Sequence, residues 1–330
     1  MKYRILIIVI LFGPFIYIAS CNRNTKAAKA TTFKFPLKLS DFHLFKGKMN
    51  NLKPAADLQL LELSSTLFTD YAEKQRLIKI PKGKKMVING DGLPVFPEGT
   101  ILVKTFYYPK DKTQSKANHQ LMETRLLILK QGKWNAGTYQ WNKNQDEAIY
   151  TTEGTTVNVA WRDLNGATRK VAYHIPGQKE CVSCHQHNEE LMPIGPKVMN
   201  LNRIVTRSNQ QVNQLTDLQQ KGLVDLQINL AKLTALPAYE NANINLDYRA
   251  RAYMEINCAH CHNPAGLAYR QSLMLNYTNP YPHTGIDFNK RNIIERMETL
   301  GEFHMPKLGT TVLDKEGIKL IKDYLKNISK

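Results

Sequence analysis

The chain has 330 residues, of which 42% are apolar and 22% charged, and its formal net charge is +17. This composition excludes a disordered or fibrous protein, and the length suits one large domain or two to three smaller ones. The positive charge favours an acidic partner or an anionic surface.

Residues 1–21 have the pattern of a bacterial lipoprotein signal. Lys2 and Arg4 form a basic start, residues 5–18 are nearly all apolar, and the segment ends in Ile-Ala-Ser-Cys at Cys21. This order is typical of a secretory signal, so we expect lipidation at Cys21 and a mature charge of about +15. An uncleaved membrane anchor is the alternative, although the apolar run is shorter than the ~20 residues of a spanning helix.

Both alternatives place the rest of the chain outside the cytoplasm. Residues 22–38 contain Asn, Lys, Thr and Ala and predict a tether. Asn22, rather than Asp, after the lipid site favours the outer membrane. We therefore expect a lipid-anchored protein of the cell envelope, on the periplasmic or surface face, with no affinity for nucleic acid.

Residues 39–176 predict an antiparallel β domain, in the form of a sandwich. The strands combine β-branched and aromatic residues with period-two stretches. Asn165-Gly166 signals a tight hairpin between the last two strands. The expected strands are Thr100–Tyr108, Glu123–Gln131, Thr155–Arg162 and Thr168–Ile175.

A C-x-x-C-H sequence follows the β-rich segment directly, at Cys181, Cys184 and His185. This spacing is the pattern of covalent haem c attachment, with both sulfurs on the porphyrin edge and the histidine on the iron. Residues 177–240 are therefore assigned to a first haem. A strand and turn, rather than an amphipathic helix, is expected before the motif.

A helix is expected later in this first haem region. Ser208 is a candidate N-cap, the helix would run over Asn209–Lys221, and Gly222 would end it.

A second C-x-x-C-H lies at Cys258, Cys261 and His262 in the segment 241–330. A helix delivering the motif, a Met-bearing loop and a terminal helix are the order of a small class I cytochrome c domain. The expected helices run from Asn245 or Asp247 to about His260, from Arg291 to Leu300, and from a cap at Asp314 to about Ile328.

The sixth iron ligands are less certain than the covalent sites. For the second haem, Met305 lies 43 residues beyond His262 in a Met-Pro loop and is the preferred ligand, with His304 as the alternative. A methionine at such a position otherwise packs in a core.

For the first haem, Met192 is preferred, because seven residues of extended chain from His185 span at most ~23–25 Å. Met199 and His174 are alternatives. A further alternative is an iron that has no sixth protein ligand and can bind small molecules.

The cysteines are fully accounted for by these sites. Of five cysteines, one takes the lipid and four bind two haems. A zinc site built from both C-x-x-C units is the alternative, but it leaves both following histidines unexplained.

The sequence resembles the bacterial dihaem c-type cytochromes with an N-terminal β domain. The resemblance covers nearly all of the chain after the tether and implies two covalent haems and electron transfer, without naming a substrate. It is carried by 39–45, 66–72, 99–106, Pro193–Lys197, Asn200–Arg203, Arg249–Tyr253 and Asn257–Gly266.

The predicted fold class is α+β: an N-terminal antiparallel β domain, then a mainly α-helical cytochrome c-like region binding two haems. The predicted function is electron transfer between redox partner proteins, by a carrier rather than a catalyst and without a separate substrate. A dihaem peroxidase-like oxidoreductase, reacting at the first haem, is the alternative. A third hypothesis is an assembly subunit that docks a partner oxidoreductase.

Overall fold

The computed structural model describes residues 33–114, 119–188, 190–307 and 309–328. Residues from Lys34 onward form one compact unit. The predicted signal, Cys21 and the first part of the predicted tether lie outside the described residues. Within the described ranges, no helix is long and apolar enough to cross a membrane.

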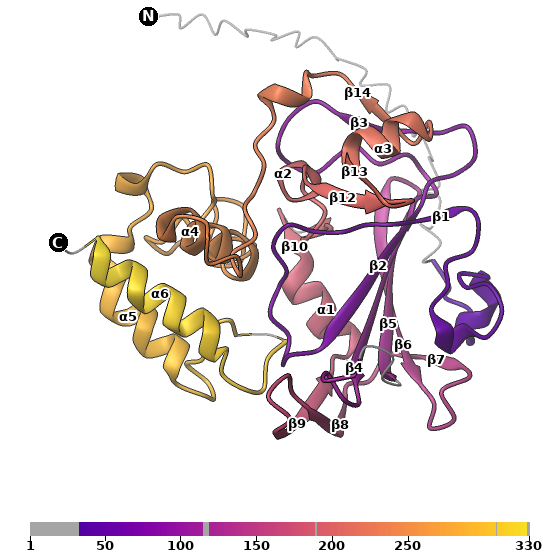
Figure 1. Cartoon of the computed structure of the whole chain (residues 1–330), viewed down its shortest axis with the longest axis horizontal. Coiled ribbons are helices and arrows are strands. Elements are labelled where there is room, and N and C mark those ends of the chain that lie inside the picture. Colours follow the sequence, from indigo (N-terminus) through magenta and orange to yellow (C-terminus); the bar gives the residue numbers. More distant parts are fainter. Residues whose placement is uncertain (1–32, 115–118, 189, 308, 329–330) are drawn as a thin grey trace, which may run out of the picture. The chain divides into compact units, whose positions relative to one another are not determined.

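An antiparallel sheet with strand order β1-β2-β4-β5-β6-β7 is the main element of the described chain (Figure 1). The strands predicted at Thr100–Tyr108 and Glu123–Gln131 are confirmed as β4 and β5, although β5 begins earlier. The sheet consists of β1 (Leu58–Leu60), β2 (Glu73–Lys79), β4 (Ile101–Pro109), β5 (His119–Lys130), β6 (Lys133–Trp141) and β7 (Ala148–Thr151).

The hairpin of β8 (Thr155–Arg162) and β9 (Thr168–Ile175) has the predicted bounds. Its turn works as the sequence indicated, because Gly166 takes a positive φ of 79°. The hairpin packs against the sheet, with the Trp161 ring 4.9 Å from the Tyr108 ring. This single hairpin takes the place of the second sheet of the expected sandwich.

The remaining elements are mostly short. Strand β14 pairs in parallel with β3, so the segment after the first motif is joined to the β-rich part. These elements are β3 (Met86–Ile88), α1 (Gln178–His185), β10 (Gln186–His187), β11 (Glu190–Leu191), α2 (Val198–Leu201), β12 (Ile204–Arg207), β13 (Gln210–Asn213), α3 (Gln214–Gln220), β14 (Val224–Leu226), α4 (Leu246–Asn257), α5 (Ile286–Glu298) and α6 (Lys315–Asn327), with 3-10 helices at Leu39–Phe42, Met49–Asn51, Leu230–Lys232 and Tyr281–His283.

The predicted fold class is wrong in its second half. Of the described residues, 28% lie in strands and 24% in helices, and no helical cytochrome-like region is evident among them. The segment 177–240 forms short strand pairs between helices of only eight, four and seven residues. Between α4 and α5, residues 258–285 form turns and one 3-10 helix.

Ser208 and Asn209 show one physical reason for this error. We expected Ser208 to cap a helix reaching Lys221, but both residues have positive φ, 48° and 63°, and form the turn between β12 and β13. Two successive positive φ values are those of a tight hairpin turn. Helix α3 therefore begins only at Gln214, capped by the side chain of Asn213.

Three longer helices occur where the sequence indicated them. Helix α4 is capped by Asn245 and α6 by Asp314, both as predicted. Helix α4 ends at Asn257, earlier than expected, and α5 begins at Ile286, before the predicted Arg291.

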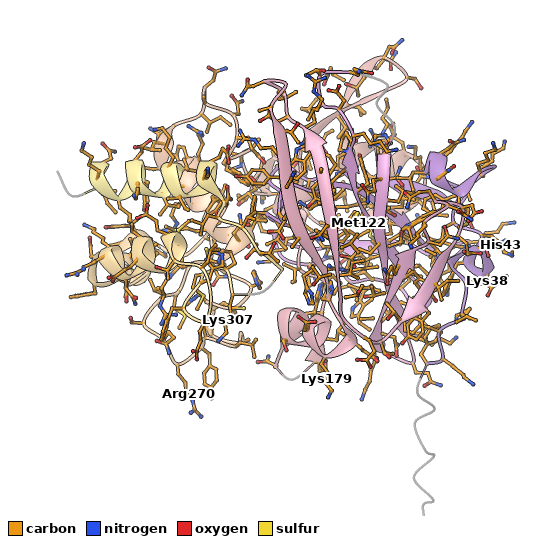
Figure 2. The ribbon with its side chains drawn as sticks, turned by 90° about the horizontal axis from the view of Figure 1, so that it is seen from below. Lys38, His43, Met122, Lys179, Arg270 and Lys307 are labelled. Atoms are coloured by element: carbon orange, nitrogen blue, oxygen red, sulfur yellow. The ribbon has the colours of Figure 1, made fainter. Side chains whose placement is uncertain are left out.

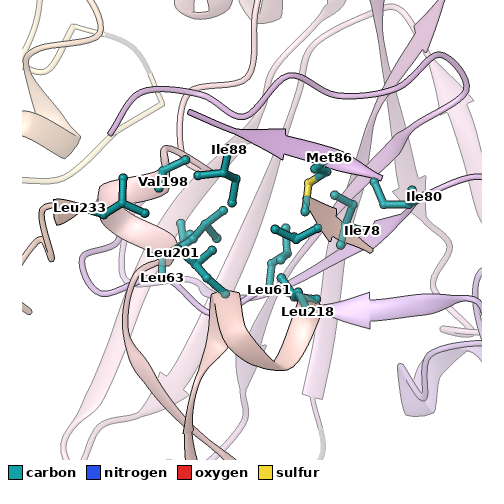
Figure 3. Packing of buried hydrophobic residues seen from close by; sticks show 12 residues of the cluster. Leu61, Leu63, Ile78, Ile80, Met86, Ile88, Val198, Leu201, Leu218 and Leu233 are labelled. Atoms are coloured by element: carbon teal, nitrogen blue, oxygen red, sulfur yellow. The ribbon is translucent and has the colours of Figure 1, made fainter. Parts of the chain in front are cut away.

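A hydrophobic cluster joins strands and helices that are distant in the sequence (Figure 3). Ile78 of β2, Met86 of β3, and Val198 and Leu201 of α2 are all essentially inaccessible to solvent. Because the cluster includes residues from both sides of the first motif, its packing fixes the segment that follows that motif.

Buried polar side chains tie the C-terminal third to the β-rich part. The Asp70 carboxylate accepts hydrogen bonds from the backbone N–H groups of Thr311 (2.7 Å) and Val312 (3.2 Å). The Asn257 side-chain oxygen, at the end of α4, accepts one from the Phe68 N–H (2.8 Å). The Asp70 contacts hold the segment before α6, and the Asn257 contact holds the end of α4, which leads into the second motif.

Truncating the Figure 3 cluster should weaken the fold. Leu201 is 0% exposed, so Leu201→Ala should lower the free energy of unfolding by about 2–5 kcal/mol, through lost burial and the cavity left behind. Leu164→Ala is the matched control, because Leu164 is 76% exposed, and should change it by less than about 0.5 kcal/mol. Urea unfolding followed by circular dichroism measures both, and equal effects would contradict the assignment.

Candidate functional site

Helix α1 carries the whole first motif, including Cys181 and Cys184, and starts directly after β9. The sequence predicted a strand and a turn before the motif. The structure has the strand β9 there, and it is followed at once by the helix α1. The Glu180 carboxylate accepts a hydrogen bond from the Gly177 N–H (2.8 Å) at the start of the helix. A Cβ on Gly177 would lie 2.9 Å from the backbone nitrogen of Gly154, so only glycine allows this close passage.

The His185 ring is oriented by the backbone of Met192. Its Nδ1–H donates to the Met192 carbonyl (2.8 Å), and the Met192 N–H donates to the His185 carbonyl (2.7 Å). Because a carbonyl can only accept, Nε2 is the unprotonated nitrogen. Burial lowers the pKa of His185 to about 4. A neutral imidazole with its other nitrogen held by a carbonyl is the usual arrangement of a metal-ligating histidine.

His185 lines a cavity between the sheet and the ends of α1 and α4. The volume of the cavity is about 160 Å³. Most lining side chains are aliphatic, among them Leu63, Leu77, Leu127 and Ile194. We call this space the His185 cavity.

Three cations form a row across the sheet where it lines the His185 cavity. Arg76 of β2 pairs in register with Lys104 of β4, which pairs with Arg125 of β5. Arg125 forms an ion pair with the buried Glu123 carboxylate. Among the described residues, no ion pair joins Arg76 or Lys104 to a carboxylate.

This row is electrostatically costly without a bound anion. Like charges directly opposite one another destabilise a sheet, and burial disfavours a charged amine. The pKa of Lys104 is accordingly held well below its usual value, by burial first and then by Arg76. Burial, and next Arg76, lowers the pKa of the neighbouring Lys74 to about 7. The cavity is thus suited to an apolar ligand that carries anionic groups.

The second motif lies in a tight turn after α4. The Asn263 side chain donates to the Ala259 carbonyl (2.8 Å) and accepts from the Ala265 N–H (2.8 Å). A Cβ on Gly266 would lie 2.4 Å from the Cys261 carbonyl oxygen. The chain therefore folds back closely over the motif, at a position where only glycine fits.

Cys258 and Cys261 are free thiols. Burial raises the pKa of Cys258 to about 12, with a further contribution from Cys261, and raises the pKa of Cys261 as well. Both sulfurs are therefore protonated and available for covalent bonding.

The His262 imidazole is also neutral. Burial lowers its pKa, and the Leu273 backbone offsets this only in part. Its Nδ1 is buried without a hydrogen-bond partner. A ring in this state can bind a metal ion.

The two motifs meet in space, which the sequence did not indicate. The Asn188 N–H, three residues after His185, donates to the carbonyl of Ala265, three residues after His262 (3.2 Å). His260, from inside the second motif, also lines the His185 cavity. The segments that follow the two motifs are therefore in contact, and each motif contributes one residue to the cavity lining.

Met305 lies in a loop that is attached to the end of α5. Its N–H donates to the Arg296 carbonyl (3.0 Å), and the Arg296 charge helps to lower the pKa of His262. The neighbouring His304 is buried, and its Nδ1–H donates to the Thr299 carbonyl (2.8 Å). Met305 and His304 both stay candidate ligands.

The candidate ligands for the first haem occupy different environments. Met192 contacts His185 through its backbone N–H and carbonyl groups, and it is not among the described residues that line the cavity. Met199 packs in a core cluster with Leu236. The Nε2 atom of His174 pairs with the Glu180 carboxylate (2.9 Å).

Comparisons with known proteins add no identity: no family model, curated protein or solved structure matches the chain significantly. Within the described side chains, no group of three or more His, Cys, Asp or Glu residues is arranged to hold a metal ion.

Adding a methyl group at Gly266 should disrupt the second motif locally. Gly266→Ala places a Cβ against the Cys261 carbonyl, and overpacking of this kind costs about 1–3 kcal/mol. Gly90→Ala is the control, because a Cβ there meets nothing within 4 Å. Thermal unfolding compares the two variants, and an unaffected Gly266→Ala protein would argue against the tight turn.

Proposed function

We propose that the chain is an exported, lipid-anchored dihaem c-type cytochrome that transfers electrons between redox partner proteins. The observation that carries the proposal is the meeting of two C-x-x-C-H motifs, through Asn188 and Ala265, beside a cavity lined by His185. Haem iron changes reversibly between Fe(II) and Fe(III), and two neighbouring haems provide an electron path.

The residues present fit this cofactor. Cys181 and Cys184, and likewise Cys258 and Cys261, would form the thioether bonds, with His185 and His262 as iron ligands. His185 already has its Nδ1 fixed by a carbonyl, which leaves Nε2 for the iron. Burial keeps both ligand histidines neutral.

The His185 cavity matches the chemistry of a porphyrin. Its largely aliphatic lining suits the ring. The propionates would be the anions that Arg76 and Lys104 lack, since carboxylates form charge-assisted hydrogen bonds with both groups. The cation row thus supports a ligand with an apolar body and an anionic edge.

Met305 is the proposed sixth ligand of the second haem, with His304 as the alternative. The support is the attachment of its loop to Arg296, whose charge acts on His262. A methionine ligand raises the reduction potential relative to a histidine, which would suit an electron carrier.

A lipid at Cys21, beyond the described residues, would hold the protein on a membrane of the cell envelope. Figure 2 shows Lys179 of α1 with Arg270 and Lys307, which follow the second motif and Met305, at the protein surface. Exposed cations near both motifs favour an acidic redox partner, by electrostatic steering.

An enzyme that reacts at the first haem is the alternative. It is favoured by the absence of Met192, the ligand preferred from the sequence, among the described residues that line the His185 cavity. Peroxide turnover and a high-spin ferric first haem would support the enzyme, and two six-coordinate haems without turnover would support the carrier.

Haem content tests the proposal directly. The mature protein, expressed with a c-type maturation system, should show a mass increase equal to two haems. Replacing Cys181 and Cys184 by Ala, or Cys258 and Cys261 by Ala, should leave one haem each. Cys21→Ala is the control and should retain two haems while leaving the membrane fraction. Bound zinc without covalent haem would overturn the proposal.

The cation row should tune the first haem. Lys104→Met should lower its midpoint potential by on the order of 50 mV, because loss of a nearby positive charge favours Fe(III). Lys82→Met, which removes an exposed charge outside the cavity, should have a much smaller effect because solvent screens it. Potentiometric titration followed by absorbance measures both, and equal shifts would argue against a haem beside Lys104.

A further inference from the structure

His260 occupies an unexpected position for a residue inside a haem-binding motif. It lies between Cys258 and Cys261 in the sequence, yet its side chain lines the His185 cavity rather than solvent. Ile256, one helical turn earlier on α4, lines the same cavity. The end of α4 therefore brings a second imidazole to the cavity from a different element than α1.

The Nδ1 atom of His260 is buried and makes no hydrogen bond of ordinary geometry. Burial lowers the pKa of His260 to about 4, and the Ile256 backbone offsets this only in part. A buried, unpaired nitrogen is unfavourable relative to a paired one, and here it belongs to a residue that lines the same cavity as His185.

The other candidates for a sixth ligand are engaged elsewhere. Met192 does not line the cavity, Met199 packs in a core cluster, and His174 pairs with Glu180. Lys104 lines the cavity, but its ammonium lies over the Phe106 ring, 4.6 Å from the centroid. His260 is the candidate with a ring in the cavity and an unpaired nitrogen.

We propose that His260 is the sixth iron ligand of the first haem, so that this iron is held by His185 and His260 together. The inference rests on the proposed dihaem function and makes it more specific. It assigns a double role to the second motif, which would bind one haem through its cysteines and His262 and the neighbouring iron through His260.

This assignment has a consequence for electron transfer. His260 is joined by one peptide bond to Cys261, whose sulfur would be bonded to the second haem. A ligand on the first iron and a thioether of the second haem would then belong to adjacent residues. The chain would thereby provide a short, fully covalent path between the two haems.

The native protein gives the first test. Near-infrared magnetic circular dichroism of the ferric protein should show one haem with two histidine ligands, alongside the second haem with its own ligand pair. Two haems without a bis-histidine signature would overturn the inference but leave the proposed function intact. Absence of covalent haem would instead defeat the proposed function.

Variants give the second test. His260→Ala should convert half of the ferric haem from low-spin to high-spin in electron paramagnetic resonance spectra, and added imidazole should restore the low-spin signal. His283→Ala, at an exposed histidine of the Tyr281–His283 turn, should leave the spectra unchanged. Unaltered spectra in His260→Ala, or the same conversion in Lys104→Met or Met192→Ala instead, would overturn the assignment.

A third variant covers the case in which His260→Ala does not mature. His260→Met keeps a side chain able to bind iron, so it should remain low-spin and raise the potential of one haem. Unchanged potentials in this variant would count against His260 as a ligand.

Discussion

The row of cations on the sheet is the constraint on which the rest of the site depends. Along β4, Leu102 packs in the Figure 3 cluster and Phe106 in the core under the β8–β9 hairpin, while Lys104 lies between them on the same face. Position 104 thus carries a charge where the strand pattern requires an apolar residue. Burial relieves part of this cost by lowering the pKa of Lys104, and Glu123 compensates Arg125.

Helix α4 links this sheet face to the second motif. The buried Glu255 carboxylate forms an ion pair with Lys197 and accepts the Tyr277 N–H (2.7 Å). Lys197 follows the segment 193–196 that lines the His185 cavity, and Tyr277 belongs to the chain beyond the motif. A single carboxylate thus fixes the cavity wall, α4 and the segment beyond the second motif, which keeps the two motifs in a defined relation.

The sequence predicted best the features that depend on neighbouring residues. The β8–β9 hairpin follows from Asn165-Gly166, and α4 and α6 follow from their caps, so these elements agree with the structure closely. The fold class failed because it depended on helices whose pattern competes with turns, as at Ser208. Strand pairing between β3 and β14 joins residues far apart in the chain, which no local pattern encodes.

The sequence showed the two C-x-x-C-H motifs, because their spacing is local, but not that they lie near one another. The position of His260 beside the His185 cavity could not be found from periodicity, since it depends on α4 meeting the sheet. The cation row did leave a partial signal, because Lys104 is a charged residue in a strand that is otherwise mostly apolar. A charge at an inward strand position, close to a cofactor motif in space, indicates what the cofactor must carry.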